Sequence, residues 1–256
     1  MIKRKSAREI DMMRQAGRIA AEARNLAGSL VNVGATTKSI DKAIHNYIIS
    51  QDAKPTFLGY RDYPASSCIS VNDEVIHGIP SARRLALGDI VSIDIGVTKS
   101  GYIGDCAATF IVGGQATKET ERLVEVTREC FYEALKKAKA GNRVSDISRA
   151  VQQHAEKNGY SVVREYTGHG VGSKIHEPPE VPNFVEVPRK KADPRLMQGM
   201  TLAIEPMINE GGAAIFVKED NWTVTTADGK NSAHYENTIL ITEDEPEILT
   251  ACEDMP

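Results

Sequence analysis

Five potential metal ligands lie in segments that otherwise have the composition of buried strands and glycine-rich loops. Four are carboxylates and one is an imidazole: Asp94, Asp105, His169, Glu205 and Glu236. Carboxylates that converge without compensation repel one another, so such a group needs protons or cations. Two divalent ions would balance four carboxylate charges. Oxygen ligands with one nitrogen therefore predict a hydrolytic site with two metal ions.

Asp94 and Asp105 are predicted to lie in one β-hairpin. Residues 91–95 alternate apolar and polar side chains, as a half-buried strand does, and a second strand is predicted over about 102–112. A tight turn centred on residues 99 and 100 would place the two aspartates directly opposite each other. Like charges in opposed positions destabilise a hairpin unless something binds them. Two solvated aspartates beside a turn are the alternative.

The remaining three candidates have weaker local signals. His169 stands between Gly168 and Gly170, and we expect it in a glycine-rich loop whose backbone can approach a ligand. Glu205 ends a short apolar run, and Glu236 precedes a strand-like segment. Each glutamate alone could face solvent. As part of the set they favour a metal site, because unpaired glutamates are out of place on a buried face.

An ordered series of motifs resembles methionine aminopeptidase, type I, from the first predicted helix to about Ile241. The motifs are Phe57-Leu58-Gly59-Tyr60, Tyr63-Pro64, Ser67-Cys68-Ile69-Ser70-Val71-Asn72, Val75-Ile76-His77-Gly78-Ile79-Pro80, the Asp94 and Asp105 hairpin, Gly168-His169-Gly170-Val171-Gly172, His176-Glu177 and Ile204-Glu205-Pro206. The resemblance implies that Asp94, Asp105 and Glu236 bridge or chelate the two metals, and that His169 and Glu205 are held mainly by one of them.

The resemblance also implies three catalytic residues. Glu205 would move the proton of the nucleophilic water, and His176 would donate a hydrogen bond to the developing oxyanion. His77 would contact the scissile amide or the residue that follows it; a histidine in an ordinary turn is the alternative. The residues that match the family's methionine pocket are Phe57, Tyr63, Cys68, Ile175 and Trp222. His77 and His176 are also expected to bind substrate.

Three positions depart from the family pattern. Ile175 stands where many relatives carry Phe, which bears on the shape of the pocket. His234 and Asn237 replace the usual Gln and His beside Glu236, which bears on the fine tuning of the metal site. His234 could support the ligands without contacting metal, but we assign it no role.

An internal repeat bears on the fold. Gly34 to Ile40 and Gly141 to Ile147 each precede a predicted amphipathic helix, at an offset of 107 residues. Each copy follows a longer helix, the first starting at the capping box Ser6-x-x-Glu9 and the second near Thr117. The expected fold class is α+β, the pseudo-two-fold pita-bread fold, with a curved, mainly antiparallel sheet covered by two pairs of helices. We expect one catalytic domain over 1–256, with halves of roughly 6–112 and 113–242.

Composition agrees with a compact enzyme of the cytoplasm. The chain is 41% hydrophobic, and it has no apolar run near the ~20 residues that a membrane span needs. Its basic start lacks the apolar stretch of a signal peptide. Four cysteines without Cys-x-x-Cys spacing are read as reduced thiols. A net charge of −4 argues against general nucleic-acid binding, and we expect a monomer with no membrane partner and no sequence-specific nucleic acid.

The activity implied by the resemblance is removal of N-terminal methionine when the second residue is small. Water or hydroxide activated by two metal ions would attack the first peptide bond. Co, Mn, Fe, Zn or Ni would suit the ligand set. The expected partners are the N-termini of nascent polypeptides. The short basic N-terminal segment could also contact ribosomal RNA transiently; a solvated surface run is the alternative.

Two other functions compete with this one. A proline-directed aminopeptidase or dipeptidase would use the same ligand architecture, but such relatives usually carry an additional N-terminal domain, which we expect to be absent here. A non-catalytic peptide-binding or ribosome-binding module on the same fold would typically lack some metal ligands, whereas all five are present.

Overall fold

The structure is a computed structural model that describes residues 2–186 and 192–252. These residues form four α-helices, two short 3₁₀ helices and fifteen strands. None of the helices is long and apolar enough to cross a membrane. The α-helices are α1 (Ala7–Ser29), α2 (Thr37–Ser50), α3 (Lys118–Leu135) and α4 (Val144–Lys157), and the 3₁₀ helices are η1 (Tyr60–Asp62) and η2 (Val112–Gly114).

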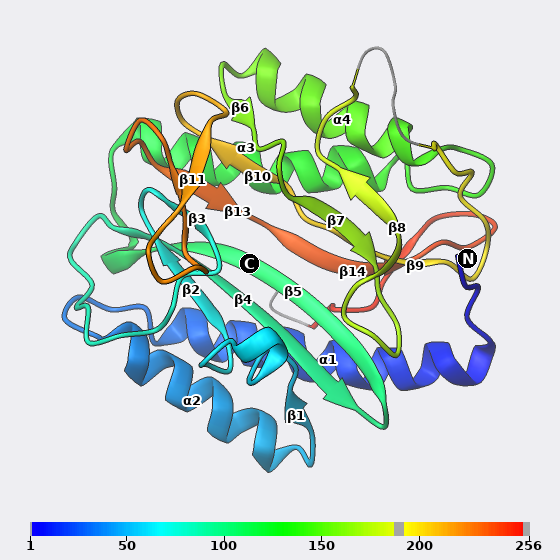
Figure 1. Cartoon of the computed structure of the whole chain (residues 1–256), viewed down its shortest axis with the longest axis horizontal. Coiled ribbons are helices and arrows are strands. Elements are labelled where there is room, and N and C mark those ends of the chain that lie inside the picture. The colour runs from blue at the N-terminus through cyan, green and yellow to red at the C-terminus, as the bar shows by residue number, and fades with distance from the viewer. Residues whose placement is uncertain (1, 187–191, 253–256) are drawn as a thin grey trace.

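A nine-stranded sheet runs through the molecule, with α1 and α2 at one end and α3 and α4 at the other (Figure 1). Its main path is β1-β4-β5-β14-β9-β7-β8; β2 also pairs with β4, and β15 with β14. Two three-stranded sheets, β13-β10-β6 and β11-β12-β3, complete the fold. All of these pairs are antiparallel, so the predicted α+β class with a mainly antiparallel sheet is confirmed. The strands are β1 (Lys54–Pro55), β2 (Cys68–Val71), β3 (Glu74–Ile76), β4 (Ile90–Lys99), β5 (Tyr102–Ile111), β6 (Ser161–Val162), β7 (Thr167–Gly170), β8 (Glu177–Pro182), β9 (Thr201–Ile204), β10 (Met207–Asn209), β11 (Ile215–Val217), β12 (Val224–Thr226), β13 (Ser232–His234), β14 (Glu236–Leu240) and β15 (Glu247–Ile248).

Three of the four α-helices, α1, α2 and α3, start at residues whose side chains satisfy the first free backbone N–H groups. Ser6 caps α1 in a reciprocal capping box with Glu9, as predicted. Thr36 caps α2 and Thr117 caps α3 by accepting a hydrogen bond from a backbone N–H three residues later. The bounds of α4 follow those of α2 by 107 residues at both ends, which is the offset of the sequence repeat. The duplication and the single catalytic domain stay predictions.

Two apolar clusters join each helix pair to part of the sheet. One holds buried residues of α1 and α2 against β2, β4 and β5. The other holds buried residues of α3 and α4 against strands from β6 to β14. Large aliphatic and aromatic side chains in them are fully buried, so each helix pair fixes the strands that it covers. Representative members are Ile19, Ile44, Ile93 and Ile95 in the first cluster and Leu123, Phe131, Ile147 and Leu202 in the second.

The predicted register of the β4–β5 hairpin is wrong by two residues. Asp94 pairs with Ala107 and Asp105 pairs with Gly96, so the aspartates are diagonal neighbours and not directly opposed. The turn is formed by Ser100 and Gly101, both with positive φ, which suits the twist of a two-residue hairpin. Because the shift is an even number of residues, both carboxylates still lie on the same face. That face is largely buried, which differs from the half-buried strand that was predicted.

Candidate metal centre and active site

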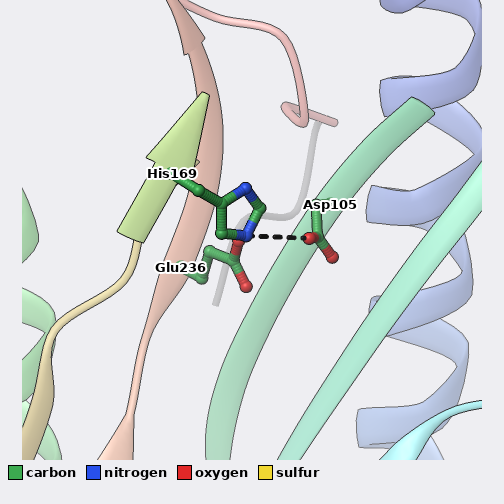
Figure 2. Close-up of side chains that lie close together, drawn as sticks. All are labelled: Asp105, His169 and Glu236. Carbon is green, nitrogen blue, oxygen red and sulfur yellow. Dashed lines mark ion pairs between the residues drawn. The ribbon is translucent and has the colours of Figure 1, made fainter. Parts of the chain in front are cut away.

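Three of the predicted ligands converge from three strands of the nine-stranded sheet. Asp105 on β5, His169 on β7 and Glu236 on β14 each direct one ligand atom into a group whose members lie within 4.8 Å of one another (Figure 2). The three residues are buried, with exposed fractions of 3%, 8% and 2%. Their convergence depends on a sheet that brings together residues from far apart in the chain.

His169 lies on a strand and not in the loop that the flanking glycines suggested. β7 pairs with both β8 and β9, so its backbone is enclosed on both sides. A Cβ added at Gly168 would meet the carbonyl of Ala203, and one added at Gly170 would meet the carbonyl of Pro178. The glycines therefore allow close approach of neighbouring strands, which a side chain would prevent.

The imidazole of His169 is held in the orientation that a metal ligand needs. Its Nδ1 lies 3.0 Å from the carbonyl oxygen of Gly170. A carbonyl only accepts, so Nδ1 carries the proton and Nε2 keeps its lone pair. Nε2 lies 3.4 Å from Oε1 of Glu205 and 3.8 Å from Oδ2 of Asp105. A backbone partner that fixes the tautomer is typical of metal-binding histidines.

Asp94 and Glu205 complete the set of four carboxylates. Burial raises the pKa of Asp94 to about 7. Burial raises the pKa of Glu205 well above its usual range, and the charges of Asp105 and Asp94 raise it further. The pKa values of Asp105 and Glu236 are raised in the same way, first by burial and then by neighbouring carboxylates. Among the described residues, no lysine or arginine forms an ion pair with these four groups, so bare protein cannot hold them all ionised at neutral pH.

Several buried atoms of the cluster have no partner. Oδ1 of Asp94, Oδ1 of Asp105 and Oε1 of Glu236 are enclosed and accept no hydrogen bond. Orphaned carboxylate oxygens are costly in a protein interior unless a cation or ordered water satisfies them. The donor set of carboxylates with one neutral imidazole suits Mn, Fe, Co, Ni or Zn. The residues therefore fit divalent metal, with Asp94, Asp105, His169, Glu205 and Glu236 able to hold it.

Two more histidines border this cluster. The rings of His169 and His176 are 4.4 Å apart between centroids, so His176 lies directly beside the predicted ligands. Its Nδ1 is 2.8 Å from the hydroxyl of Tyr60, a residue of the family motif for which no catalytic role was predicted. His77 has a positive φ of 59°, uncommon for a residue with a side chain, and burial lowers its pKa to about 4.

The predicted pocket residues form an apolar wall next to the cluster. Tyr63 and Cys68 are buried together and contact Phe57 and Trp222. The Trp222 ring meets Tyr63 edge to face at 5.0 Å and His77 at 6.0 Å. Cys68 pairs with Asp94 across β2 and β4, so the wall begins beside a carboxylate of the cluster. Burial raises the pKa of the Cys68 thiol well above its usual range, which agrees with a wall residue and not a nucleophile.

Ile175 lies in a neighbouring apolar cluster, which it shares with Val171. Phe57 and Tyr60 pack against that cluster. Phe57 also contacts the wall formed by Tyr63 and Cys68, so its aromatic ring joins the two apolar clusters.

His234, which was assigned no role, lies at the edge of the carboxylate cluster. Its Nε2 is 3.9 Å from Oε2 of Glu205 and 4.0 Å from Oε2 of Glu236, and it has no hydrogen-bond partner. Burial lowers its pKa to about 3, so the ring is neutral. In the sequence, the departure from the family pattern is the one signal that distinguishes His234. Its proximity to two carboxylates is visible only in the structure.

Asn237 faces the opposite side of the sheet from the cluster. Its side-chain oxygen accepts hydrogen bonds from Nη1 of Arg24 and from the hydroxyl of Thr250, both at 2.9 Å. Arg24 is fully buried and also lies 3.4 Å from the carbonyl oxygen of Glu236. The unusual asparagine therefore has a partner on α1 that supports the backbone at the start of β14.

Similarity to known proteins extends over almost the whole chain. A methionine aminopeptidase of Clostridium perfringens is 50% identical over 250 residues, covering 98% of this chain and 99% of that protein. The crystal structure of a methionine aminopeptidase from Thermotoga maritima is 42% identical, with a TM-score of 0.94 and coverage of 98% of this chain and 100% of that one. Prolidase from Pyrococcus furiosus is 24% identical, with a TM-score of 0.79, and the match covers 98% of this chain and 66% of the prolidase chain. At this identity the similarity is one of fold alone. These matches confirm the predicted pita-bread fold. A sequence model of metallopeptidase family M24 matches residues 11–243, and the chain belongs to that family.

Proposed function

We propose that the protein removes N-terminal methionine from polypeptides whose second residue is small, using two divalent metal ions. The observation that carries this proposal is the convergence of Asp105, His169 and Glu236 beside Glu205 and Asp94, with several carboxylate oxygens buried and unpartnered. Membership of a metallopeptidase family and the names of full-length relatives point to the same reaction. The apolar wall of Tyr63, Cys68 and Trp222 is suited to a flexible thioether side chain.

Metal ions bound by the five ligands would polarise the scissile carbonyl and activate water for attack. Glu205 is assigned the proton transfer. Its side chain directly follows β9 and is largely buried, 12% exposed, and Oε1 lies 3.4 Å from Nε2 of His169. A carboxylate beside the water that the metals would activate can accept a proton from that water and release it to the leaving amine.

His176 is assigned to the developing oxyanion. A Tyr60 hydroxyl that donates to Nδ1 would leave the proton of the ring on Nε2, from which His176 can donate a hydrogen bond to substrate. Burial lowers the pKa of His176, which favours the neutral ring. His77, packed edge to face against Trp222 and Tyr166, is assigned to the scissile amide or the residue that follows it.

A narrow subsite for the second residue gives a specificity prediction. A β-branched or long second side chain would push the scissile carbonyl away from the reacting groups, and a displacement of about 1 Å can cost about 10²-fold in rate. We expect Met-Ala, Met-Gly and Met-Ser peptides to be cleaved about 10²-fold faster than Met-Ile or Met-Lys peptides in kcat/KM. A panel of peptides that differ only at the second residue, with released methionine quantified, measures this ratio.

The same panel, extended with X-Pro peptides whose first residue is not methionine, separates the competing functions. Equal rates on Met-Ala and Met-Lys would indicate a broader aminopeptidase. Cleavage of X-Pro peptides without release of methionine would favour a proline-directed enzyme, the activity named for the Pyrococcus furiosus structure that shares the fold. Binding of peptides without hydrolysis in the presence of metal would favour a non-catalytic module.

The remaining features of the proposal follow from this reaction. The substrates would be N-termini of nascent polypeptides, the enzyme would act as a monomer in the cytoplasm, and any ribosome contact would be transient. We propose Co, Mn, Fe, Zn or Ni as the metal pair, since each suits carboxylate ligands with one imidazole.

A further inference from the structure

A buried ion pair ties the N-terminal segment to the strand that follows His176. Nζ of Lys5 lies 2.9 Å from Oε2 of Glu177, and the two side chains are only 4% and 7% exposed. Lys5 directly precedes the residue that caps α1, and its backbone N–H donates to the carbonyl of Gly199 at 2.6 Å. Lys5 is therefore held both by its ammonium group and by its backbone.

Glu177 in turn fixes the short segment that carries His176. Its Oε1 accepts a hydrogen bond of 3.3 Å from the backbone N–H of Lys174, so one carboxylate holds both ends of residues 174–177. Gly172 lies against the same pair, because a Cβ added there would meet Cε of Lys5 at 2.5 Å and Oε1 of Glu177 at 2.7 Å.

The packed segment also connects to the strand that carries Asp105. The carbonyl of Gly172 accepts a hydrogen bond of 2.9 Å from the N–H of Ile103 on β5. The ion pair thus lies where the N-terminal segment, β5 and residues 171–177 meet. Removing one partner of a buried pair leaves an uncompensated charge, and the local backbone must rearrange to hydrate it.

We propose that Lys5 is a positioning residue that acts through Glu177 to hold the imidazole of His176 at the reacting peptide bond. The proposal rests on the role of His176 in the proposed function. Among the described residues, neither side chain of the pair contacts a carboxylate of the cluster, so loss of the pair should displace His176 and leave metal binding intact. Because His176 acts on the transition state, displacing it should lower kcat and change KM little.

The test combines Lys5→Met with His176→Ala in a double-mutant cycle on the metal-loaded enzyme with a Met-Ala-Ser peptide. Lys5→Met should lower kcat by about tenfold or more in the wild-type background, with KM within about threefold and metal content unchanged. In the His176→Ala background the same substitution should cost almost nothing, because the group that it positions is already gone. Equal losses in both backgrounds, or no loss in either, would overturn the proposal.

Arg4→Met is the matched control. Arg4 is in the same segment and donates to the carbonyl of Gln198, but it is exposed. Its substitution should leave kcat unchanged. If Lys5→Met does not fold, Glu177→Gln replaces it in the same double-mutant cycle. Glu177→Gln keeps the side-chain volume and removes the charge.

A second readout does not depend on catalysis. The imidazole resonances of His176, assigned by their loss in His176→Ala, should shift in Lys5→Met and stay in place in Arg4→Met. Unshifted resonances would refute the positioning role even in an enzyme with full activity. Shifted resonances in a protein that releases no methionine would instead support the positioning contact and place the failure with the proposed function.

Discussion

Asp105→Asn should bring methionine release close to zero while the fold is retained. Asp105 is 3% exposed and lies within the group formed with His169 and Glu236, and one of its oxygens has no protein partner. An amide is neutral and a poor bridging ligand, so the site would lose both charge and a ligand atom for metal. Because asparagine has nearly the same shape and relieves repulsion among the carboxylates, the protein without metal should unfold at an equal or higher urea concentration than wild type.

Three measurements check this expectation: methionine release from Met-Ala-Ser, metal content after dialysis, and urea unfolding of the metal-free protein. Asp244→Asn makes the same chemical change at an exposed position and should behave as wild type. Wild-type turnover by Asp105→Asn, with its full metal content, would contradict the assignment of Asp105.

His176→Ala should lower kcat by about 10²–10³, the loss typical of removing one donor to an oxyanion. KM and metal content should change little, because His176 contacts the His169 ring and the Tyr60 hydroxyl but does not belong to the converging ligand group. Steady-state kinetics on Met-Ala-Ser with metal analysis of the same samples measures both quantities. A rise in KM with unchanged kcat would assign His176 to substrate binding.

His154→Ala is a suitable control for this experiment. His154 is on α4, and its Nε2 is 2.7 Å from a carboxylate oxygen of Glu129 on α3, in a contact that involves no member of the carboxylate cluster. Its substitution should leave kcat unchanged.

Local signals in the sequence predicted much of the fold. The capping box at Ser6 and Glu9 marks the start of α1, and Thr117 marks the start of α3. The repeated helices appear at the predicted offset, each with an apolar face buried in its own cluster. Capping and amphipathic periodicity depend on neighbours within a few residues, which is why a single sequence reveals them.

The details that were missed depend on contacts between distant residues or on the choice of turn. The hairpin register followed from Ser100 and Gly101 adopting positive φ, and the predicted turn was displaced by one position. The strand character of residues 167–170 requires pairing with β9, more than thirty positions later. The contact between Tyr60 and His176 spans 116 positions, and nothing in either local sequence indicates it.

The site residues were predicted as a set because their chemistry restricts the possibilities more than their local structure does. Four carboxylates and one histidine in apolar surroundings need cations wherever they converge. This argument did not identify His234 as part of the site. One histidine near Glu236 has an ordinary packing explanation, and it is the separations of 3.9 Å from Glu205 and 4.0 Å from Glu236 that connect it to the cluster.

A metal titration with methionine release as the readout tests the central claim most directly. Metal-free protein would be titrated anaerobically with Co²⁺ or Mn²⁺, and methionine released from Met-Ala-Ser would be quantified at each ratio of metal to protein. We expect no release without metal, a rise as metal binds, and saturation at no more than two ions per chain. Full methionine release by protein that remains metal-free in the presence of a chelator would contradict the assignment of this cluster as a hydrolytic metal centre.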